Sequence, residues 1–114
     1  MDRQPQSSIW TNAITILEIQ TGLQVMPDGK KKVSLSADFE RLLDRMDHRI
    51  VAFDEPAARF AAELTGLRQK KGRTGELRDT MIAGIVLSHH ASLATRNVTH
   101  FADISATVVN PWEA

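Results

Sequence analysis

The sequence contains no cysteine, so it can form neither a disulfide framework nor a thiolate metal site. A reducing compartment therefore suits the chain at least as well as an oxidising one. No apolar run approaches the roughly 20 residues that cross a bilayer. The opening segment MDRQPQSSIW also lacks the basic region and the apolar stretch of a signal peptide. These absences predict a cytoplasmic protein that does not enter a membrane.

An excess of charge of either sign is also absent, because 14 Lys and Arg residues balance 14 Asp and Glu residues. Such a chain does not hold nucleic acid by bulk electrostatic attraction, so any contact with nucleic acid must be local. The one conspicuous basic run is Lys30 to Lys32, directly after the turn-like Pro27-Asp28-Gly29. A solvated loop is the favoured interpretation of this run, and contact with phosphate is the alternative.

The length of 114 residues and the hydrophobic content of 42% suit one compact domain that spans residues 1–114. Short apolar, β-branched segments alternate with longer segments of helical periodicity. The strand candidates are 8–14, 50–53, 91–95 and 107–109. Residues 50–53 show no polar alternation, which is typical of a strand buried on both faces of a parallel sheet. The alternation predicts an α/β fold with a mostly parallel sheet flanked by helices.

Four segments have helical patterns. Thr15 and Glu18 have the spacing of a capping box, which predicts a helix that starts at Thr15. Ser36 is the predicted cap of a second helix. Asp54 is the predicted cap of a third, with Pro56 in its first turn and an end near Gln69. The last runs from Glu76 to His89. The predicted apolar faces are Phe39, Leu42, Leu43 and Met46 in the second helix, Ala57, Phe60, Ala61, Leu64 and Leu67 in the third, and Ile82, Ile85 and Val86 in the last.

Two acids lie near the starts of predicted helices. Glu18 is in the first turn after the first predicted strand, and Asp79 is in the first turn of the helix that begins at Glu76. In open α/β sheets, functional sites lie beyond the carboxyl ends of the strands, so we expect these side chains to lie close together there. Carboxylates from separate segments can hold magnesium for phosphodiester cleavage. Spacing alone favours plainer roles: Glu18 in a capping box, and Asp79 as an acid that complements a helix dipole.

The segments NAITILEIQTGL, FDEPAARFAAEL, GRTGELRDTMIAGIVLSHHASLATRNVTHF and VVNPW follow one another in this order. As an ordered set, they resemble the VapC/FitB branch of the PIN-domain ribonucleases over nearly the whole chain. The family's I-T-x-x-E-x-x-x-G segment is matched by Glu18 and Gly22. Its Asp shortly before I-A at a helix start is matched by Asp79. The closing N-P-W of this branch is matched by Asn110, Pro111 and Trp112.

The resemblance implies a three-layer PIN fold and an endoribonuclease that depends on Mg²⁺ or Mn²⁺. It also implies the toxin of a type II toxin–antitoxin pair, which binds its antitoxin and forms a homodimer. Glu18 and Asp79 are then catalytic metal ligands, and Asn97 supports the acidic cluster. Arg96 contacts the RNA phosphate, although an ordinary loop ion pair is an equal alternative for this residue.

The sequence departs from the family pattern in two places. No L-D-T-N-like segment precedes Ser8, so the first central strand and its metal-binding Asp are expected to be missing. A start codon assigned too late and a genuine truncation are two explanations. His100 stands before Phe101, where relatives often have Asp. At position 100 we favour an exposed histidine without a role over a ligand of a transition metal or phosphate, and at Asp103 we favour a solvated loop acid over a partial substitute for the absent acid.

Two functional hypotheses from different classes follow. The first is a metal-dependent RNA-cleaving toxin. The second is a truncated, inactive PIN domain that only dimerises or binds antitoxin. In-frame coding sequence before Met1 that ends a hydrophobic strand in Asp would favour the first hypothesis.

Overall fold

The computed structural model describes residues 10–111, and the chain divides into two compact units between Ala52 and Phe53. We call them the N-terminal and the C-terminal unit and describe each by itself. Ser8 and Ile9 of the first predicted strand and Trp112 of the closing motif lie outside the described residues. The prediction of one domain over residues 1–114 stays a prediction.

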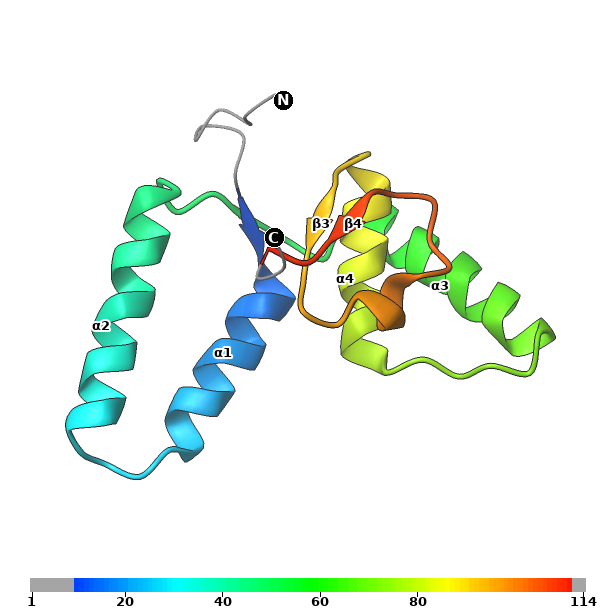
Figure 1. Cartoon of the computed structure of the whole chain (residues 1–114). Helices are drawn as coiled ribbons and strands as arrows, with labels where there is room; N and C mark the ends of the chain where they lie inside the picture. Colours follow the sequence, from blue (N-terminus) through cyan, green and yellow to red (C-terminus); the bar gives the residue numbers. More distant parts are fainter. Residues whose placement is uncertain (1–9, 112–114) are drawn as a thin grey trace. The chain divides into compact units, whose positions relative to one another are not determined.

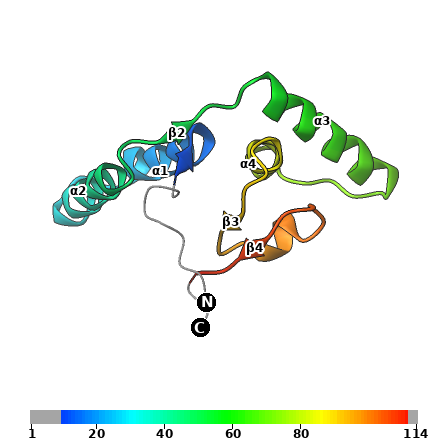
Figure 2. The same cartoon turned by 90° about the horizontal axis from the view of Figure 1, so that it is seen from above.

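The N-terminal unit holds a short parallel strand pair and a helical hairpin. Strand β1 (Thr11–Asn12) pairs with β2 (Ile50–Val51), with Thr11 opposite Ile50. Helix α1 (Ala13–Val25) follows β1 directly, and α2 (Lys30–Arg45) leads back toward β2. Figures 1 and 2 both show the two helices side by side.

Both predicted starts of these helices were wrong. Asn12 caps α1, because its side chain accepts a hydrogen bond from the Thr15 backbone N–H at 2.9 Å. Thr15 and Glu18 therefore lie inside the helix and not in a capping box. Helix α2 begins at Lys30, so Ser36 lies within it and the basic run forms its first turn. The strand at 50–51 is also less buried than predicted, since Ile50 is 42% exposed.

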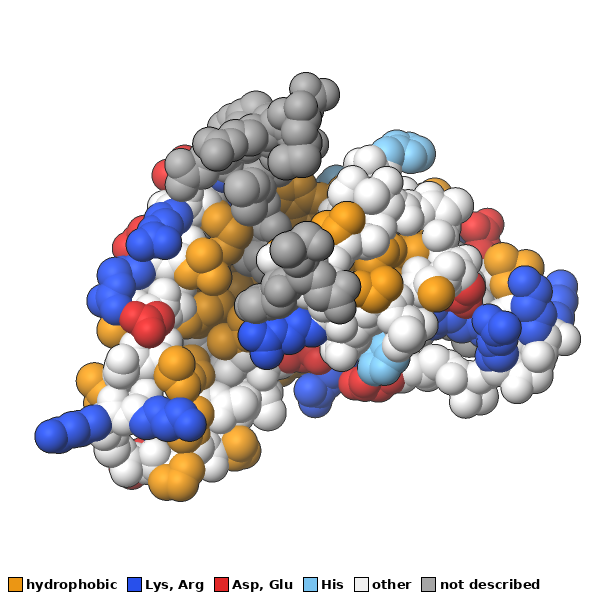
Figure 3. All heavy atoms as spheres, in the orientation of Figure 1, with side chains coloured by type: hydrophobic (Ala, Val, Ile, Leu, Met, Phe, Trp, Pro, Cys, Tyr) orange, Lys and Arg blue, Asp and Glu red, His pale blue; other side chains and the backbone are white. Residues whose placement is uncertain are grey.

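The core of the N-terminal unit lies between the two helices. The buried side chains are Leu23 from α1, Phe39 and Leu43 from α2, and Met46, the C-cap of α2, with Ile16 and Ile19 packed against them. In Figure 3, charged side chains lie along the outer edge of α2 and hydrophobic ones lie toward α1. The predicted apolar stripe of α2 is confirmed except for Leu42, which is 46% exposed.

The C-terminal unit begins with helices α3 (Glu55–Lys70) and α4 (Leu77–Ser88). Asp54 caps α3 as predicted, because its side chain accepts a hydrogen bond from the Ala57 N–H at 3.1 Å. The chain continues through β3 (Leu93–Ala94), the 3-10 helix η2 (Val98–Phe101) and β4 (Val108–Val109). Strands β3 and β4 pair in parallel, within the two predicted segments.

Helix α4 is the most buried element of the C-terminal unit. Figure 2 shows it between α3 on one side and the β3–β4 pair on the other. All three residues of its predicted apolar face are buried: Ile82, Ile85 and Val86. The architecture is thus a mixed α/β fold with parallel strand pairs, as the sequence predicted.

Gly84 allows α3 and α4 to approach closely. A Cβ atom at Gly84 would lie 2.3 Å from the Ala57 carbonyl oxygen and 3.0 Å from the Ala61 Cβ. These atoms belong to the backbone of α3 or are attached directly to it. They can make room for a Cβ only if the whole helix shifts. A Cβ atom added at Gly66, within α3, would meet no neighbouring atom within 4 Å. Gly66 therefore offers a matched comparison.

We expect Gly84→Ala to lower the free energy of unfolding by about 1–3 kcal/mol, because the added methyl group forces the helices apart. Gly66→Ala should instead raise it by roughly 0.5–1 kcal/mol, the usual gain from replacing glycine in an exposed helix. Urea titration of both variants measures the two shifts. A stabilising Gly84→Ala would contradict the close contact.

Candidate metal site at the start of helix α4

The start of α4 brings two carboxylates together on one side of the helix. Glu76 is the N-cap residue, and Asp79 lies in the first turn, three residues later. Residues at this spacing are neighbours on a helix surface. Asp79 is 7% exposed, and its carboxylate lies at the positive end of the helix dipole. The predicted position of Asp79 in the first turn is confirmed.

His100 joins this pair from the end of η2. Its Nδ1 lies 2.6 Å from Asp79 Oδ2, so the imidazole N–H donates a hydrogen bond to the carboxylate. His100 is exposed as expected, but it has a buried partner, so the expectation of a histidine without any interaction was wrong. The imidazole remains half-exposed, whereas the Asp79 side chain is 9% exposed. The contact thus links a buried acid to the open side of the site.

Glu76, Asp79 and His100 have the arrangement of a partial metal site. Each offers one ligand atom, and these atoms all lie within 4.8 Å of one another. Two ligands of one ion, bound at about 2.1 Å, are separated by roughly 3 to 4.2 Å. Small side-chain rotations would bring the three atoms to such distances. The donor set therefore fits a divalent cation.

A pocket of about 300 Å³ opens over this cluster. Its lining includes Glu76, Asp79 and His100, together with the cationic Arg73 at the exposed end of the loop before α4. A cation held by the acids can bind a phosphate oxygen, and the neighbouring guanidinium can donate hydrogen bonds to another. The pocket therefore suits a phosphate substrate.

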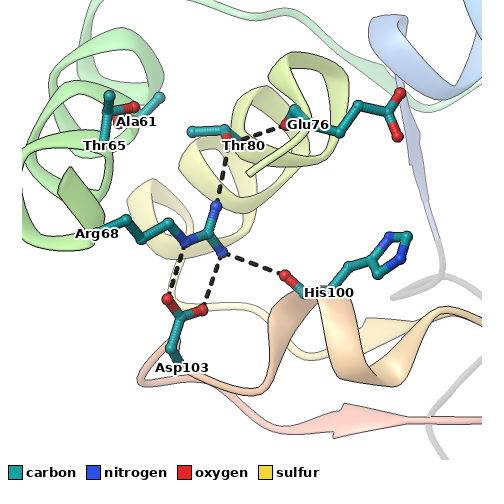
Figure 4. A network of polar contacts seen from close by, with 7 residues as sticks. All are labelled: Ala61, Thr65, Arg68, Glu76, Thr80, His100 and Asp103. Carbon is teal, nitrogen blue, oxygen red and sulfur yellow. Dashed lines mark hydrogen bonds and ion pairs between the residues drawn. The ribbon is translucent and has the colours of Figure 1, made fainter. Parts of the chain in front are cut away.

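Arg68 holds the segments that carry the cluster in place through hydrogen bonds. It projects from α3, where it continues the buried stripe of Ala57, Ala61 and Leu64, and its side chain is 7% exposed. Figure 4 shows its guanidinium reaching the η2 loop and α4 at once. It donates to Asp103 Oδ2 at 2.8 Å and Oδ1 at 2.9 Å, to the His100 carbonyl at 3.1 Å and to Thr80 Oγ1 at 3.0 Å.

This network corrects the prediction for Asp103, which pairs with the buried Arg68 and is not a free acid in solvent, although its side chain stays 25% exposed. Hydrogen bonds from Arg68 lower the pKa of the Asp103 carboxyl, more strongly than burial raises it. The same hydrogen bonds raise the pKa of the Arg68 guanidinium. Both groups are therefore charged at neutral pH, and they tie the loop that carries His100 to α3 and α4.

Gly75 makes room for the Arg68 guanidinium. A Cβ atom at Gly75 would lie 2.5 Å from Arg68 Nη1 and 3.3 Å from Thr80 Oγ1. Thr80 in turn donates its hydroxyl hydrogen to the Glu76 carbonyl at 3.0 Å. The Arg68 guanidinium therefore holds both the backbone at the start of α4, through Thr80, and the backbone of His100.

The other predicted site residues are not part of this cluster. Glu18 lies in the middle of α1, in the N-terminal unit, so its proximity to Asp79 stays a prediction. Asn97 precedes η2, and its backbone N–H donates to Thr95 Oγ1 at 3.1 Å. Within the described part of the chain, neither Arg96 nor Asn97 lines the pocket. Their roles likewise stay predictions.

Three residues of the site were not assigned to it from the sequence: Glu76, His100 and Arg68. Glu76 was detectable as an acid three residues before Asp79 on the same helix. His100 was noticed as a departure from the family pattern, and binding of a metal or phosphate was the less favoured of its two interpretations. Arg68 had one signal, its place four residues after Leu64 on the apolar stripe of α3. An arginine on a buried stripe requires a partner, but the sequence does not name it.

The PIN-domain family model matches residues 1–106. The chain belongs to the PIN-domain family. Three relatives are similar over most of its length. The plasmid stability protein StbB of Pseudomonas syringae is 33% identical and covers 100% of this chain and 83% of its own. The VapC ribonuclease Y4jK of Sinorhizobium fredii is 30% identical and covers 99% and 81%.

Toxin FitB of Neisseria gonorrhoeae is 31% identical over 91% of this chain and 76% of its own length. The crystal structure of FitAcB from the same organism matches with a TM-score of 0.85 and 29% identity, covering 97% of this chain and 81% of that one. The family resemblance recognised from the motifs is thereby confirmed. No helix among residues 10–111 is both long enough and apolar enough to cross a membrane.

Proposed function

We propose that this protein is a metal-dependent endoribonuclease and the toxin of a toxin–antitoxin pair, acting in the cytoplasm. The observation that carries the proposal is the cluster of Glu76, Asp79 and His100 at the open pocket of a PIN domain. The relative named as a VapC ribonuclease and the relative named as a toxin support the two halves of the proposal.

In the proposed mechanism, Asp79 and Glu76 hold Mg²⁺ or Mn²⁺, and Glu18 joins them as the family resemblance implies. When bound, such an ion lowers the pKa of water and stabilises charge on the attacked phosphate. The chain's own residues position the substrate. Arg73 at the pocket donates hydrogen bonds to a phosphate oxygen of the RNA. Arg96 contacts another phosphate of the same RNA. Asn97 supports the acidic cluster through the loop that carries His100.

The same proposal includes a protein partner. The α1–α2 hairpin exposes apolar side chains, among them Leu17 at 51%, Val33 at 69% and Val25 at 78%. Exposed apolar side chains on one hairpin suit an antitoxin segment or a second copy of the chain. The relative named as Toxin FitB supports a toxin of this kind, and we propose that its protein partner is an antitoxin.

Cleavage of a single-stranded RNA panel tests the nuclease. The assay uses the printed chain and a version extended upstream through any in-frame codons, because the family pattern has an Asp before the position of Ser8. We expect cleavage with Mg²⁺ or Mn²⁺, loss of cleavage with EDTA, and at least a tenfold fall on Asp79→Asn.

Glu63→Gln serves as the control, because Glu63 is an exposed acid on α3 of the same unit. Glu18→Gln adds an independent arm, and a fall similar to that of Asp79→Asn would support a shared site. Cleavage that persists in EDTA, or that Asp79→Asn leaves intact in both versions, would refute the proposed nuclease.

A further inference from the structure

His100 offers this site a nitrogen atom as a possible metal ligand, whereas Glu76 and Asp79 offer carboxylate oxygens. The family pattern that the sequence resembles has Asp before the phenylalanine that is Phe101 here, so at this position the chain offers an imidazole nitrogen where the pattern offers a carboxylate. Its Nδ1 lies 2.6 Å from Asp79 Oδ2, at the open side of a buried acid. The substitution therefore falls at the cluster and not on a remote surface.

The position of His100 is fixed by more than its contact with Asp79. Arg68 donates a hydrogen bond to the His100 carbonyl and holds Asp103, three residues later, through two further hydrogen bonds. Figure 4 shows the imidazole on the side of the η2 loop that faces the Glu76 region, while the backbone faces Arg68. The side chain thus stands on a loop that is anchored to both helices, which is what a metal ligand requires.

We propose that His100 is a metal ligand that turns the selectivity of this site from Mg²⁺ toward transition-metal ions of the Mn²⁺, Co²⁺ and Zn²⁺ class. The inference rests on the proposed function, since it concerns the ion at the same site. Mg²⁺ prefers an all-oxygen octahedron and gives up its waters reluctantly. Imidazole suits the transition ions, and their affinity for a mixed nitrogen and oxygen site increases from Mn²⁺ toward Co²⁺.

The Asp79 contact is compatible with this role. A proton between His100 Nδ1 and Asp79 joins the two groups when no ion is bound. A divalent cation can take the place of that proton at Nδ1 when the ring proton moves to Nε2, because the imidazole then stays neutral and its Nδ1 lone pair points toward the ion that Asp79 and Glu76 hold. This arrangement places one nitrogen and two carboxylates on the ion.

The test compares metal binding in the full chain and does not require RNA cleavage. Isothermal titration with Co²⁺, Mn²⁺ and Mg²⁺ gives three dissociation constants for each variant. We expect His100→Asp to lower the ratio of Co²⁺ to Mg²⁺ affinity by at least tenfold, on the order of the loss of one good ligand interaction. His100→Gln, which keeps a neutral polar side chain, should lose Co²⁺ affinity without gaining Mg²⁺ affinity.

His90→Asn is the matched control. His90 lies outside the cluster and has a φ of 50°, which asparagine tolerates, so this variant should keep the wild-type ratio. Pulsed electron paramagnetic resonance of the Mn²⁺-loaded protein supplies a direct readout. We expect coupling to one imidazole ¹⁴N in the wild type and in His90→Asn, and no such coupling in His100→Asp.

The outcomes separate this inference from the nuclease proposal. If Asp79→Asn abolishes metal binding but His100→Asp changes neither the affinity ratio nor the nitrogen coupling, the role of His100 is refuted and the metal site remains. If the wild-type chain binds none of the three ions, or binds them independently of Asp79, both proposals fail. A selectivity change in His100→Asp together with loss of the nitrogen coupling supports the inference.

Discussion

Replacing Asp103 with Ala is expected to lower the free energy of unfolding by about 1.5–3 kcal/mol, the usual contribution of hydrogen bonds to charged groups, because the Arg68 guanidinium loses its two hydrogen bonds to this carboxylate. The Arg68 side chain is 7% exposed and the Asp103 side chain is 25% exposed, and both line the pocket, so the guanidinium would keep its charge with fewer partners and with water only on the pocket side. The loss is large beside the total stability of a domain this size, typically about 5–15 kcal/mol. Urea titration or thermal melting measures it.

Arg59→Met supplies the control on the same helix. Arg59 pairs with Glu55, four residues earlier, but the two side chains are 76% and 74% exposed. Such a pair is worth less than about 1 kcal/mol, so its removal should change little. The double variant Arg68→Met with Asp103→Leu should recover much of the loss, because it removes both charges together. An Asp103→Ala variant as stable as wild type would contradict the buried pair.

The dependence of this effect on pH has a definite sign. Hydrogen bonds from Arg68 lower the pKa of Asp103 below the ordinary aspartate value of about 3.9. A lowered folded-state pKa means that the pair stabilises fully above the ordinary value and loses its contribution as pH falls through the lowered one. The difference in unfolding free energy between wild type and Asp103→Ala should therefore shrink below about pH 4.

Leu43→Ala is the second substitution with a large expected effect, about 2–5 kcal/mol of lost unfolding free energy. Leu43 is 6% exposed and packs with Leu23, Phe39 and Met46 in the core of the helical hairpin. Truncation leaves a cavity between α1 and α2 that two short helices cannot close without losing other contacts. The measurement is again a denaturant titration.

Leu42→Ala is the natural comparison, because Leu42 is the neighbouring residue of the same helix and is 46% exposed. Its removal should cost under about 1 kcal/mol, since little buried surface is lost. Equal losses at positions 42 and 43 would show that the apolar stripe packs differently from the described core.

Local signals in the sequence predicted part of the fold well. Asp54 caps α3, Asp79 falls in the first turn of α4, and both paired segments after α4 were located. Each of these features depends on residues a few positions apart. The first helix was placed two residues late because Asn12 supplies the cap that Thr15 was expected to supply. Two competent cap residues stood close together, and sequence alone did not rank them.

Features that join distant residues were less predictable. Asp103 was expected in solvent because nothing near it in the sequence is a partner, whereas Arg68 lies 35 residues earlier. His100 was expected to have no role for the same reason, since Asp79 lies 21 residues earlier. The family resemblance identified Asp79 and Glu18 as site candidates. It did not identify Arg68, whose role comes from the packing of α3 against the η2 loop.

The long separation between Arg68 and Asp103 has a consequence for the newly synthesised chain. Translation at about 5–20 residues per second takes roughly 2–7 seconds to add the residues between them. During that interval Arg68 lacks the carboxylate that accepts its two hydrogen bonds, so its charge favours a hydrated side chain and opposes close packing of α3. The C-terminal unit therefore acquires its final packing late in synthesis, after Asp103 has left the ribosome. A chain interrupted before that point would keep α3 and α4 accessible to proteases.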